Sequence, residues 1–578
     1  MRNLNLLPTL CLAALPFGLV ACGGGGSPQA GAGQVDNLEI LDLGLPAEAT
    51  LVGAFDPLAD EYRLRLPFLG DTLALRPIYA NPGAVSTGTI GLQDAGFGEL
   101  EALVAEGDNE FEFSASLAAT GEQRSVRVVV QRAFAAQVRH ANTLKSDVAR
   151  TGDGIGAAVA TEGGLLVVGA PKEDLQQGST TLADAGAVYL FERSGDSWTQ
   201  VARLQAPAPG ADDFFGTSVA VAGEVLVVGA PGEDGAGAAV DPLVDEGALD
   251  CGAAYIFRRI DGTWTPTHYL KPDAPGLRNT RAFGTAVKIV GQTIAVGAPQ
   301  EGTRLATGGF LVPAARAGAV YTFVEEGAEL RFAQRLQAPD AAVAADYGMA
   351  LAGSGARLAI GAPGADAQRG KVYLMARTSS LAGFELQSEI VAPNASIQDA
   401  FGRSLDLSAD RLVIGAPGED SGAEGVGGDQ LDESAQNSGA AYVYEVKGQF
   451  LLFEAYIKGL SNTAGARFGA SVALANDIVC VGAPLDIGAA FGEETNGIVP
   501  IAPIGSVFTY TRREGAFTAA GAMRAANPHA GAQFGASVAI GADDIVVGSP
   551  EERSFGAGID GSSVVVGGPG RGAVLAFR

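Results

Sequence analysis

The chain has 578 residues, of which 47% are hydrophobic, 18% are charged and 82 are glycine. Its formal net charge of −27 argues against a nucleic-acid partner, because phosphate binding relies on clustered lysine and arginine. The apolar content argues against wholesale disorder, and the glycines lack the every-third-residue period of collagen. Three histidines and four cysteines leave little material for chemistry that depends on those residues.

Residues 1–21 are predicted to be a signal peptide. Arg2 precedes an apolar stretch that is too short for an ordinary membrane span. The sequence LVAC at 19–22 resembles the lipobox of bacterial lipoproteins, in which the peptide is cut before the cysteine and a lipid is attached to its sulfur. This resemblance implies that Cys22 is lipidated and anchors the protein in the cell envelope, at the outer membrane or cell surface. An ordinary secretory signal is the alternative, and the glycine-rich residues 22–35 are expected to form a flexible tether.

Residues 36–134 are expected to form a small antiparallel β-sandwich. Polar and apolar residues alternate in EYRLRLP (61–67) and NEFEFSAS (109–116), which predicts half-buried strands between turns. The sequence FDP at 55–57, followed by Tyr62, lies in an order of motifs that resembles the bacterial cadherin-like β-sandwich domain. The calcium motifs of cadherins are not visible in this segment, and a spacer domain is the simplest interpretation.

A repeat fills the rest of the chain. A Gly-Ala-Pro motif (GAP) or a close relative occurs seven times, and an aromatic–glycine pair, Ile-Gly in the first repeat, precedes each one. The two glycines are always 13 residues apart, and two further β-rich blocks follow, joined by turn-forming pairs. Four short strands in each of seven repeats predict an all-β fold with a seven-bladed β-propeller. The GAP glycines are Gly169, Gly229, Gly297, Gly361, Gly415, Gly482 and Gly548.

The propeller is predicted to span residues 137–578 and to close through a displaced strand at 137–145. The chain ends directly after the third block of the last repeat, so that blade lacks a fourth strand of its own. Leu144 lies 12 residues before Gly156, the first repeat glycine, and most internal fourth strands show the same spacing. Pairing this strand with the last blade would remove two free sheet edges.

These blocks resemble the FG-GAP repeat, which forms the blades of integrin α-chain propellers and of many bacterial surface proteins. Calcium-binding repeats of this kind carry an Asp-rich loop between the two glycine motifs. Here that connection is a tight hairpin such as Ala222-Gly223, with no room for a 12-residue oxygen-ligand loop. We therefore expect no resident cofactor, and metal-dependent integrin function is not implied.

Acidic residues gather in the loops that follow the GAP motifs. The distance from the GAP glycine to the third-block glycine varies from 9 to 24 residues, and these loops hold 23 Asp and Glu against six Lys and Arg. Such loops share one face of a propeller, where they could bind Ca²⁺ weakly or attract a cationic partner. A solvated acidic rim without a ligand is the alternative. The candidate rim residues are Glu173, Asp174, Glu233, Asp234, Asp366, Glu419, Asp420 and Asp486.

No nucleophile elbow, phosphate-binding loop, HExxH or CxxC motif occurs, so no catalytic residue is predicted. We expect a lipid-anchored cell-envelope protein that contacts the membrane through its lipid and presents the propeller to an unknown protein or glycan. Two alternatives stay open. One is a hydrolase or lyase that acts on extracellular polymers through paired acids at the propeller mouth. The other is a structural scaffold of the envelope.

Overall fold

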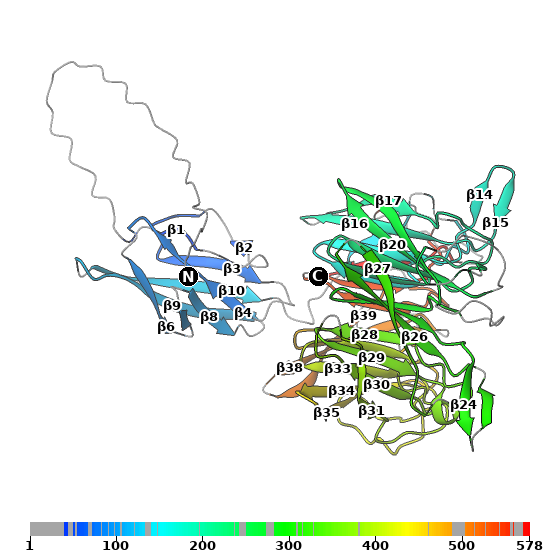
Figure 1. The fold of residues 1–578 in the computed structure, drawn as a ribbon. Helices are drawn as coiled ribbons and strands as arrows, with labels where there is room; N and C mark the ends of the chain where they lie inside the picture. The colour runs from blue at the N-terminus through cyan, green and yellow to red at the C-terminus, as the bar shows by residue number, and fades with distance from the viewer. Residues whose placement is uncertain are drawn as a thin grey trace, which may run out of the picture.

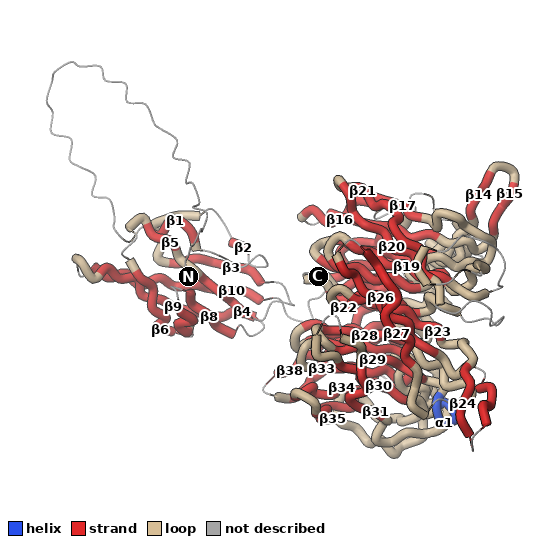
Figure 2. Tube along the Cα trace, viewed as in Figure 1, coloured by secondary structure: helices blue, strands red, loops and turns tan. Residues whose placement is uncertain are grey.

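The computed structural model describes most of residues 38–578, with its longer gaps at 133–139, 242–249, 273–281, 488–502 and 560–569. The predicted signal peptide, Cys22 and the tether lie outside the described residues. The described chain consists of strands and loops with one four-residue helix, α1 (Ala365–Gln368) (Figures 1 and 2). This confirms the predicted all-β fold class. No helix in the described part is long and apolar enough to cross a membrane.

The N-terminal strands form three sheets around one buried apolar cluster that includes Leu64, Leu73, Phe113 and Val128. The expectation that all pairings are antiparallel is wrong for β3 and β10, which run parallel. A parallel pair needs a long connection, and six strands separate these two along the chain. The sheets are β2 (Thr50–Leu51), β3 (Glu61–Leu66), β10 (Glu122–Arg132), β9 (Gly107–Leu117) and β6 (Val85–Ile90); β4 (Thr72–Leu75), β8 (Glu99–Leu103) and β7 (Gln93–Gly96); and β1 (Ile40–Asp42) with β5 (Ile78–Tyr79).

Seven four-stranded antiparallel sheets follow in the described chain, here called blades 1 to 7. Blade 1 is β12 (Ala158–Glu162), β13 (Leu165–Ala170), β16 (Ala187–Ser194) and β17 (Ser197–Leu204); blade 2 is β18 (Ser218–Ala222), β19 (Val225–Ala230), β20 (Ala253–Ile260) and β21 (Thr263–Leu270); blade 3 is β22 (Ala286–Val290), β23 (Thr293–Ala298), β26 (Ala319–Glu326) and β27 (Glu329–Leu336); blade 4 is β28 (Ala350–Ser354), β29 (Arg357–Ala362), β30 (Lys371–Ala376) and β31 (Glu385–Ile390).

The remaining three blades follow the same plan. Blade 5 is β32 (Ser404–Leu407), β33 (Arg411–Ala416), β34 (Ala440–Lys447) and β35 (Phe450–Ile457); blade 6 is β36 (Ser471–Ala475), β37 (Ile478–Ala483), β38 (Ser506–Arg513) and β39 (Ala516–Met523); blade 7 is β40 (Ser537–Ile540), β41 (Ile545–Ser549), β42 (Ala573–Phe577) and β11 (His140–Leu144). Two loops carry hairpins of their own, β14 (Leu175–Gln177) with β15 (Thr180–Leu182) and β24 (Thr303–Thr307) with β25 (Phe310–Ala314), and both project from the propeller in Figure 1.

The blades form a closed ring. The first strand of each blade packs against the first strand of the next, and β40 of blade 7 packs against β12 of blade 1. Strand β11 completes blade 7 by pairing antiparallel with β42, with His140 opposite Phe577 and Leu144 opposite Val574. This pairing is the one that the repeat spacing predicts, although residues 137–139 of the expected strand lie outside the described residues.

The aromatic–glycine and GAP motifs meet at the boundary between neighbouring blades. A Cβ on Gly297 would lie 2.0 Å from the carbonyl oxygen of Gly348 in the next blade. Gly348 has a φ of +93°, which side chains rarely allow. Gly548 of blade 7 would meet the carbonyl oxygen of Gly156 in blade 1 at the same 2.0 Å. The two motifs are therefore halves of one contact that recurs around the ring, and this contact fixes their spacing.

Candidate functional site

The fourth residue after the GAP glycine is acidic in six of the seven blades. A tight turn precedes it, in which its N–H donates to the carbonyl three residues earlier, and every one of these residues is at most 4% exposed. The expectation of an exposed rim is therefore wrong for Glu173, Glu233, Glu419 and Asp486. The physical reason is that each of these side chains finds hydrogen-bond partners inside the protein. The full set is Glu173, Glu233, Glu301, Glu419, Asp486 and Glu552.

In blades 2 and 5 the buried partner is a lysine. The Lys271 ammonium group and the Tyr269 hydroxyl both donate to Glu233, the latter at 2.5 Å. Lys458 donates to a Glu419 oxygen at 2.6 Å, and Lys271 and Lys458 are both 0% exposed. Burial lowers the pKa of Lys458, although the Glu419 carboxylate opposes this shift.

Blade 7 repeats the arrangement with Glu552 and Lys145, which follows the closing strand and is 2% exposed. In all three lysine blades, a loop residue forms an isolated antiparallel bridge with the last apolar residue of the fourth strand. The bridged pairs are Val240 with Leu270, Val426 with Ile457, and Ile559 with Leu144. A described residue of the loop after the GAP motif thus lies beside the end of the fourth strand, next to the lysine.

Blades 1 and 3 use an arginine. Arg203 donates to Glu173 at 2.8 Å through Nε, and Arg335 donates to Glu301 at 2.9 Å. A tyrosine of the third strand also donates to each carboxylate, and the Tyr321 hydroxyl does so at 2.7 Å. The arginines are the residues directly before the last apolar residue of the fourth strand, so their position differs by two from that of the lysines.

Blades 4 and 6 depart from both patterns. Blade 4 has Ala365 at the acidic position, and Asp340 from the preceding linker binds Lys371 and the Tyr373 hydroxyl, each at 2.5 Å. The candidate Asp366 lies on the surface of this blade, 3.2 Å from the Lys371 ammonium group. In blade 6, Asp486 accepts a hydrogen bond from the Ser506 hydroxyl at 2.5 Å.

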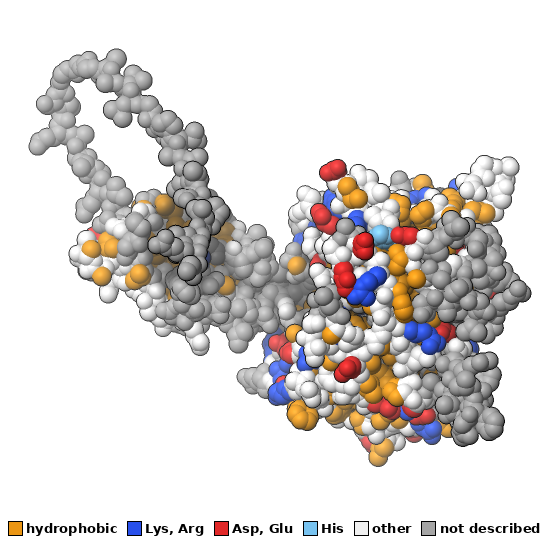
Figure 3. Space-filling view, viewed as in Figure 1, with side chains coloured by type: hydrophobic (Ala, Val, Ile, Leu, Met, Phe, Trp, Pro, Cys, Tyr) orange, Lys and Arg blue, Asp and Glu red, His pale blue; other side chains and the backbone are white. Residues whose placement is uncertain are grey.

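The three other candidates are more exposed, and their carboxylates accept hydrogen bonds from backbone N–H groups at the bases of their loops. Asp174 accepts a hydrogen bond from the backbone N–H of Asp184 at 3.1 Å. Asp234 accepts one from the N–H of Asp250 at 2.8 Å, and Asp420 accepts one from Asn437 at 2.7 Å. The eight candidates are spread over five blades, and no three His, Cys, Asp or Glu side chains of the described residues gather in a way that could hold a metal ion. On the face drawn in Figure 3, acidic and basic side chains are interspersed.

Three buried aspartates escaped the sequence analysis, although each stands three residues before a repeat glycine. Each side chain accepts a hydrogen bond from a backbone N–H three residues earlier. For Asp153 the donor is Arg150 at 2.5 Å, for Asp213 it is Gly210 at 2.6 Å, and for Asp399 it is Ser396 at 2.7 Å. Burial, reinforced by the neighbouring Glu173 and Glu419 carboxylates respectively, raises the pKa of Asp153 and of Asp399 to about 7.

Comparison with known proteins identifies two FG-GAP repeats. The family model described as "FG-GAP repeat" matches residues 198–257 and 384–444, each time from the fourth strand of one blade into the third strand of the next. A search of the curated proteins finds no match. Among solved structures, one similar chain comes from "Crystal Structure of Mitotic Checkpoint Complex", with 11% sequence identity and a TM-score of 0.37. The similarity covers 75% of this chain and 94% of that chain.

Proposed function

We propose that the protein is a lipid-anchored component of the cell envelope whose propeller binds a protein or a glycan. The observation that carries the proposal is a closed ring of blades with a nearly constant frame and loops that differ from blade to blade. Variable loops on a rigid scaffold are where binding residues usually lie. The FG-GAP repeats and the lipobox at residues 19–22 support the same proposal.

The binding surface is proposed to be the exposed parts of the loops rather than the carboxylates at their bases. A carboxylate that already accepts hydrogen bonds from buried Lys271 and Tyr269 would have to break them before it could bind a ligand. The hairpin β14–β15, by contrast, has its Gln176, Gln177, Thr180 and Thr181 side chains largely exposed.

The anchor is tested by metabolic labelling with palmitate. Cys22→Ser is expected to abolish labelling and to move the protein from the membrane fraction to the soluble fraction. Cys11→Ser is the matched control, because Cys11 belongs to the segment that signal cleavage removes. Unchanged membrane association of the Cys22→Ser variant would contradict the lipid anchor.

Binding is tested with the full chain carrying Cys22→Ser, on a glycan array and in a pull-down from envelope extracts. A variant in which residues 175–182 are replaced by glycine and serine tests the loop surface, and an equivalent replacement of 303–314 serves as a second loop. Loss of a ligand with either loop variant would support the proposal. Absence of any ligand for the parent chain would contradict it and favour a scaffold role.

A further inference from the structure

His529 lies in the linker between β39 and β40, and its side chain is 10% exposed. The backbone N–H of Arg553 donates a hydrogen bond to its Nε2 atom at 2.7 Å. A ring nitrogen that accepts a hydrogen bond carries no proton, so this contact requires a neutral imidazole whose proton is on Nδ1. The Nδ1 atom lies 3.4 Å from the carbonyl oxygen of Ala530, which can accept a hydrogen bond from it.

The histidine touches the loop that holds the closing strand. Arg553 directly follows Glu552, whose carboxylate accepts hydrogen bonds from Lys145 and, at 2.8 Å, from the N–H of Ser554. Lys145 directly follows β11, and its ammonium group also donates to the Ser554 carbonyl oxygen at 2.8 Å. His529 Nε2 lies 3.8 Å from the Glu552 carboxylate. One side chain thus joins the linker before blade 7 to the residues that bind the end of β11.

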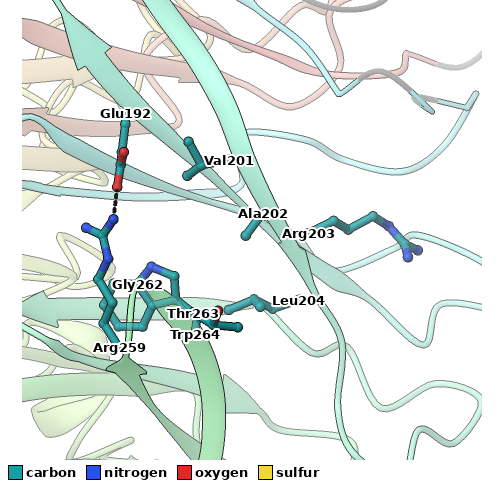
Figure 4. Close-up of a pocket in the computed structure, with 9 residues that line it drawn as sticks. All are labelled: Glu192, Val201, Ala202, Arg203, Leu204, Arg259, Gly262, Thr263 and Trp264. Carbon is teal, nitrogen blue, oxygen red and sulfur yellow. Dashed lines mark ion pairs between the residues drawn. The ribbon is translucent and has the colours of Figure 1, made fainter.

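Strand β11 differs from the fourth strands of the other blades in how the chain reaches it. There the third strand runs directly into the fourth, and in blade 2 the turn at Gly262, beside a pocket between blades 1 and 2, makes this connection (Figure 4). Strand β11 instead precedes the propeller blades in sequence and is held by its pairing with β42, by the bridge between Leu144 and Ile559, and by Lys145. Because no hairpin ties it to β42, β11 can separate from blade 7 by local opening.

Blades 2 and 5 bury the same kind of lysine–glutamate pair without a histidine beside it. The repeat position of His529 holds Gly210 in blade 2 and Ser396 in blade 5, and the N–H of each donates to a buried aspartate. Blade 7 has Ala532 at the position of that aspartate. Burial raises the pKa of the blade 5 aspartate, Asp399, to about 7. Acid therefore removes a buried charge in blade 5, whereas in blade 7 it adds one.

Among the described residues, three charged groups act on the His529 ring: Glu552, Arg553 and Lys145. Burial is the main influence on the pKa of His529 and lowers it, and the two cations lower it further. The Ala530 carbonyl and the Glu552 carboxylate act in the opposite direction. The net effect favours a neutral ring, in agreement with the hydrogen bond that the ring accepts.

We propose that protonation of His529 releases the closing strand, which makes blade 7 the acid-sensitive point of the ring. A protonated Nε2 can no longer accept a hydrogen bond from the Arg553 N–H, which then loses its partner. The new imidazolium proton faces the Glu552 carboxylate and competes with Lys145 for it. Both effects weaken the hold on β11, and this switch is independent of the ligand that the propeller binds.

Acid favours opening because the pKa of His529 is lowered in the closed blade. Once its contacts open, the ring titrates near its ordinary value of about 6.5. Below about pH 6.5 the open form therefore binds a proton that the closed form lacks, so the closed form loses stability as the pH falls. The loss is complete once the pH lies below the lowered pKa of the closed form.

Hydrogen–deuterium exchange of the full chain carrying Cys22→Ser tests the switch. Exchange of residues 140–144 is measured between about pH 7.5 and about pH 5 and is divided by the intrinsic exchange rate at each pH. We expect the protection of this segment to fall about tenfold toward the acidic end, the effect of one lost hydrogen bond of typical strength. Strands β21 and β35, the fourth strands of the two other lysine blades, should keep their protection.

The chain has three histidines, so each can be replaced in turn. His529→Gln offers an amide oxygen to the Arg553 N–H but no titrating ring, and it should hold the protection of β11 constant across the range. His140→Gln and His268→Gln are the matched controls and should retain the fall in protection. His140 is the critical control, because it lies on β11 itself, with its Nε2 2.9 Å from the Thr143 hydroxyl.

A second measurement keeps His529 in place, in case His529→Gln does not fold. The ¹⁵N resonances of the histidine rings are assigned by elimination with the two control variants. The His529 ring should show the Nδ1–H tautomer near neutral pH, and the midpoint of its protonation should coincide with the midpoint of the loss of β11 protection.

Four results would overturn the switch: constant protection of β11 down to the acidic end of the range, an equal loss of protection in β21, an undiminished fall in His529→Gln, or a His529 ring that stays neutral while β11 opens.

Discussion

Lys271 is completely buried beside the Glu233 carboxylate, and this pairing should be essential for stability. Removing one member of a buried ion pair leaves an uncompensated charge, which costs about 3–5 kcal/mol. We expect Lys271→Met to lower the free energy of unfolding by that amount in denaturant titrations.

The exposed pair of Arg331 and Glu326 supplies the matched control for this variant. Its side chains are 49% and 43% exposed, so Arg331→Gln should change stability much less than Lys271→Met does. The double variant Lys271→Met with Glu233→Gln should recover part of the loss because no unpaired charge remains. Equal effects of Lys271→Met and Arg331→Gln would refute the structural role of the lysine.

Asp399 should make stability depend on pH. Burial, with a smaller effect of the Glu419 carboxylate, raises its folded-state pKa to about 7, whereas an unfolded aspartate titrates near 4. Between these two values the folded chain keeps a proton that the unfolded chain has lost, so this group makes stability fall as pH rises from about 4 to about 7.

We therefore expect Asp399→Asn to be more stable than the parent chain at pH 8, by about 2–4 kcal/mol, and nearly equal to it at pH 4. Thermal unfolding across this range checks the prediction. Asp261→Asn, at an exposed turn, should leave the pH dependence unchanged. An Asp399→Asn curve parallel to that of the parent chain would show that the carboxyl is ionised throughout.

At the scale of the blade, the contact between glycine motifs sets how closely neighbours approach. A methyl group at Gly297 would collide with the Gly348 carbonyl, which belongs to backbone and cannot swing away. Gly297→Ala should destabilise the protein by at least about 3 kcal/mol, measured by denaturant unfolding. Gly541→Ala is the control, because its Cβ would lie 3.3 Å from the Thr161 side chain and 3.5 Å from the Asp544 carbonyl oxygen, and should be tolerated.

The strands could be predicted from sequence because each is short and apolar and ends at a turn pair. The constant spacing of the glycines predicted the register of the strands. It reflects the contact between the glycine motifs of neighbouring blades, which cannot be read from the sequence. The burial of Glu233 could not be predicted, because its partner Lys271 lies 38 residues away and other blades use arginine instead. One sequence feature pointed to this burial: in three repeats a lysine directly follows the last apolar residue of the fourth strand. The parallel pairing of β3 and β10 had no local signal at all.

At the scale of the whole molecule, the ring depends on β11. Leu144 is 1% exposed and packs in the cluster between blades 7 and 1. Leu144→Ala should cost about 2–5 kcal/mol, as a buried Leu→Ala change does elsewhere. Leu336→Ala, at the equivalent place in blade 3, should cost a similar amount. A much smaller loss at Leu144 would mean that the ring does not depend on this strand.

The distribution of acidic side chains leads to a prediction about calcium. The buried carboxylates that the sequence suggests as possible Ca²⁺ ligands already accept hydrogen bonds inside the protein. Millimolar Ca²⁺ should therefore leave the melting temperature unchanged relative to EDTA. Scanning calorimetry checks this, since a ligand that binds only the folded state raises that temperature. A reproducible rise would point to a calcium site that the described residues do not contain.

The pairing of β11 with β42 joins an early segment of the chain to one of the last segments to be synthesised. Leu144 meets Val574, which the ribosome adds 430 residues later. At about 5–20 residues per second, that interval lasts roughly 20–90 s. During this time the edge that β11 will cover does not yet exist, and the nascent strand is free to pair with other chains. The early strand therefore stays without its partner until nearly the whole chain is available for folding.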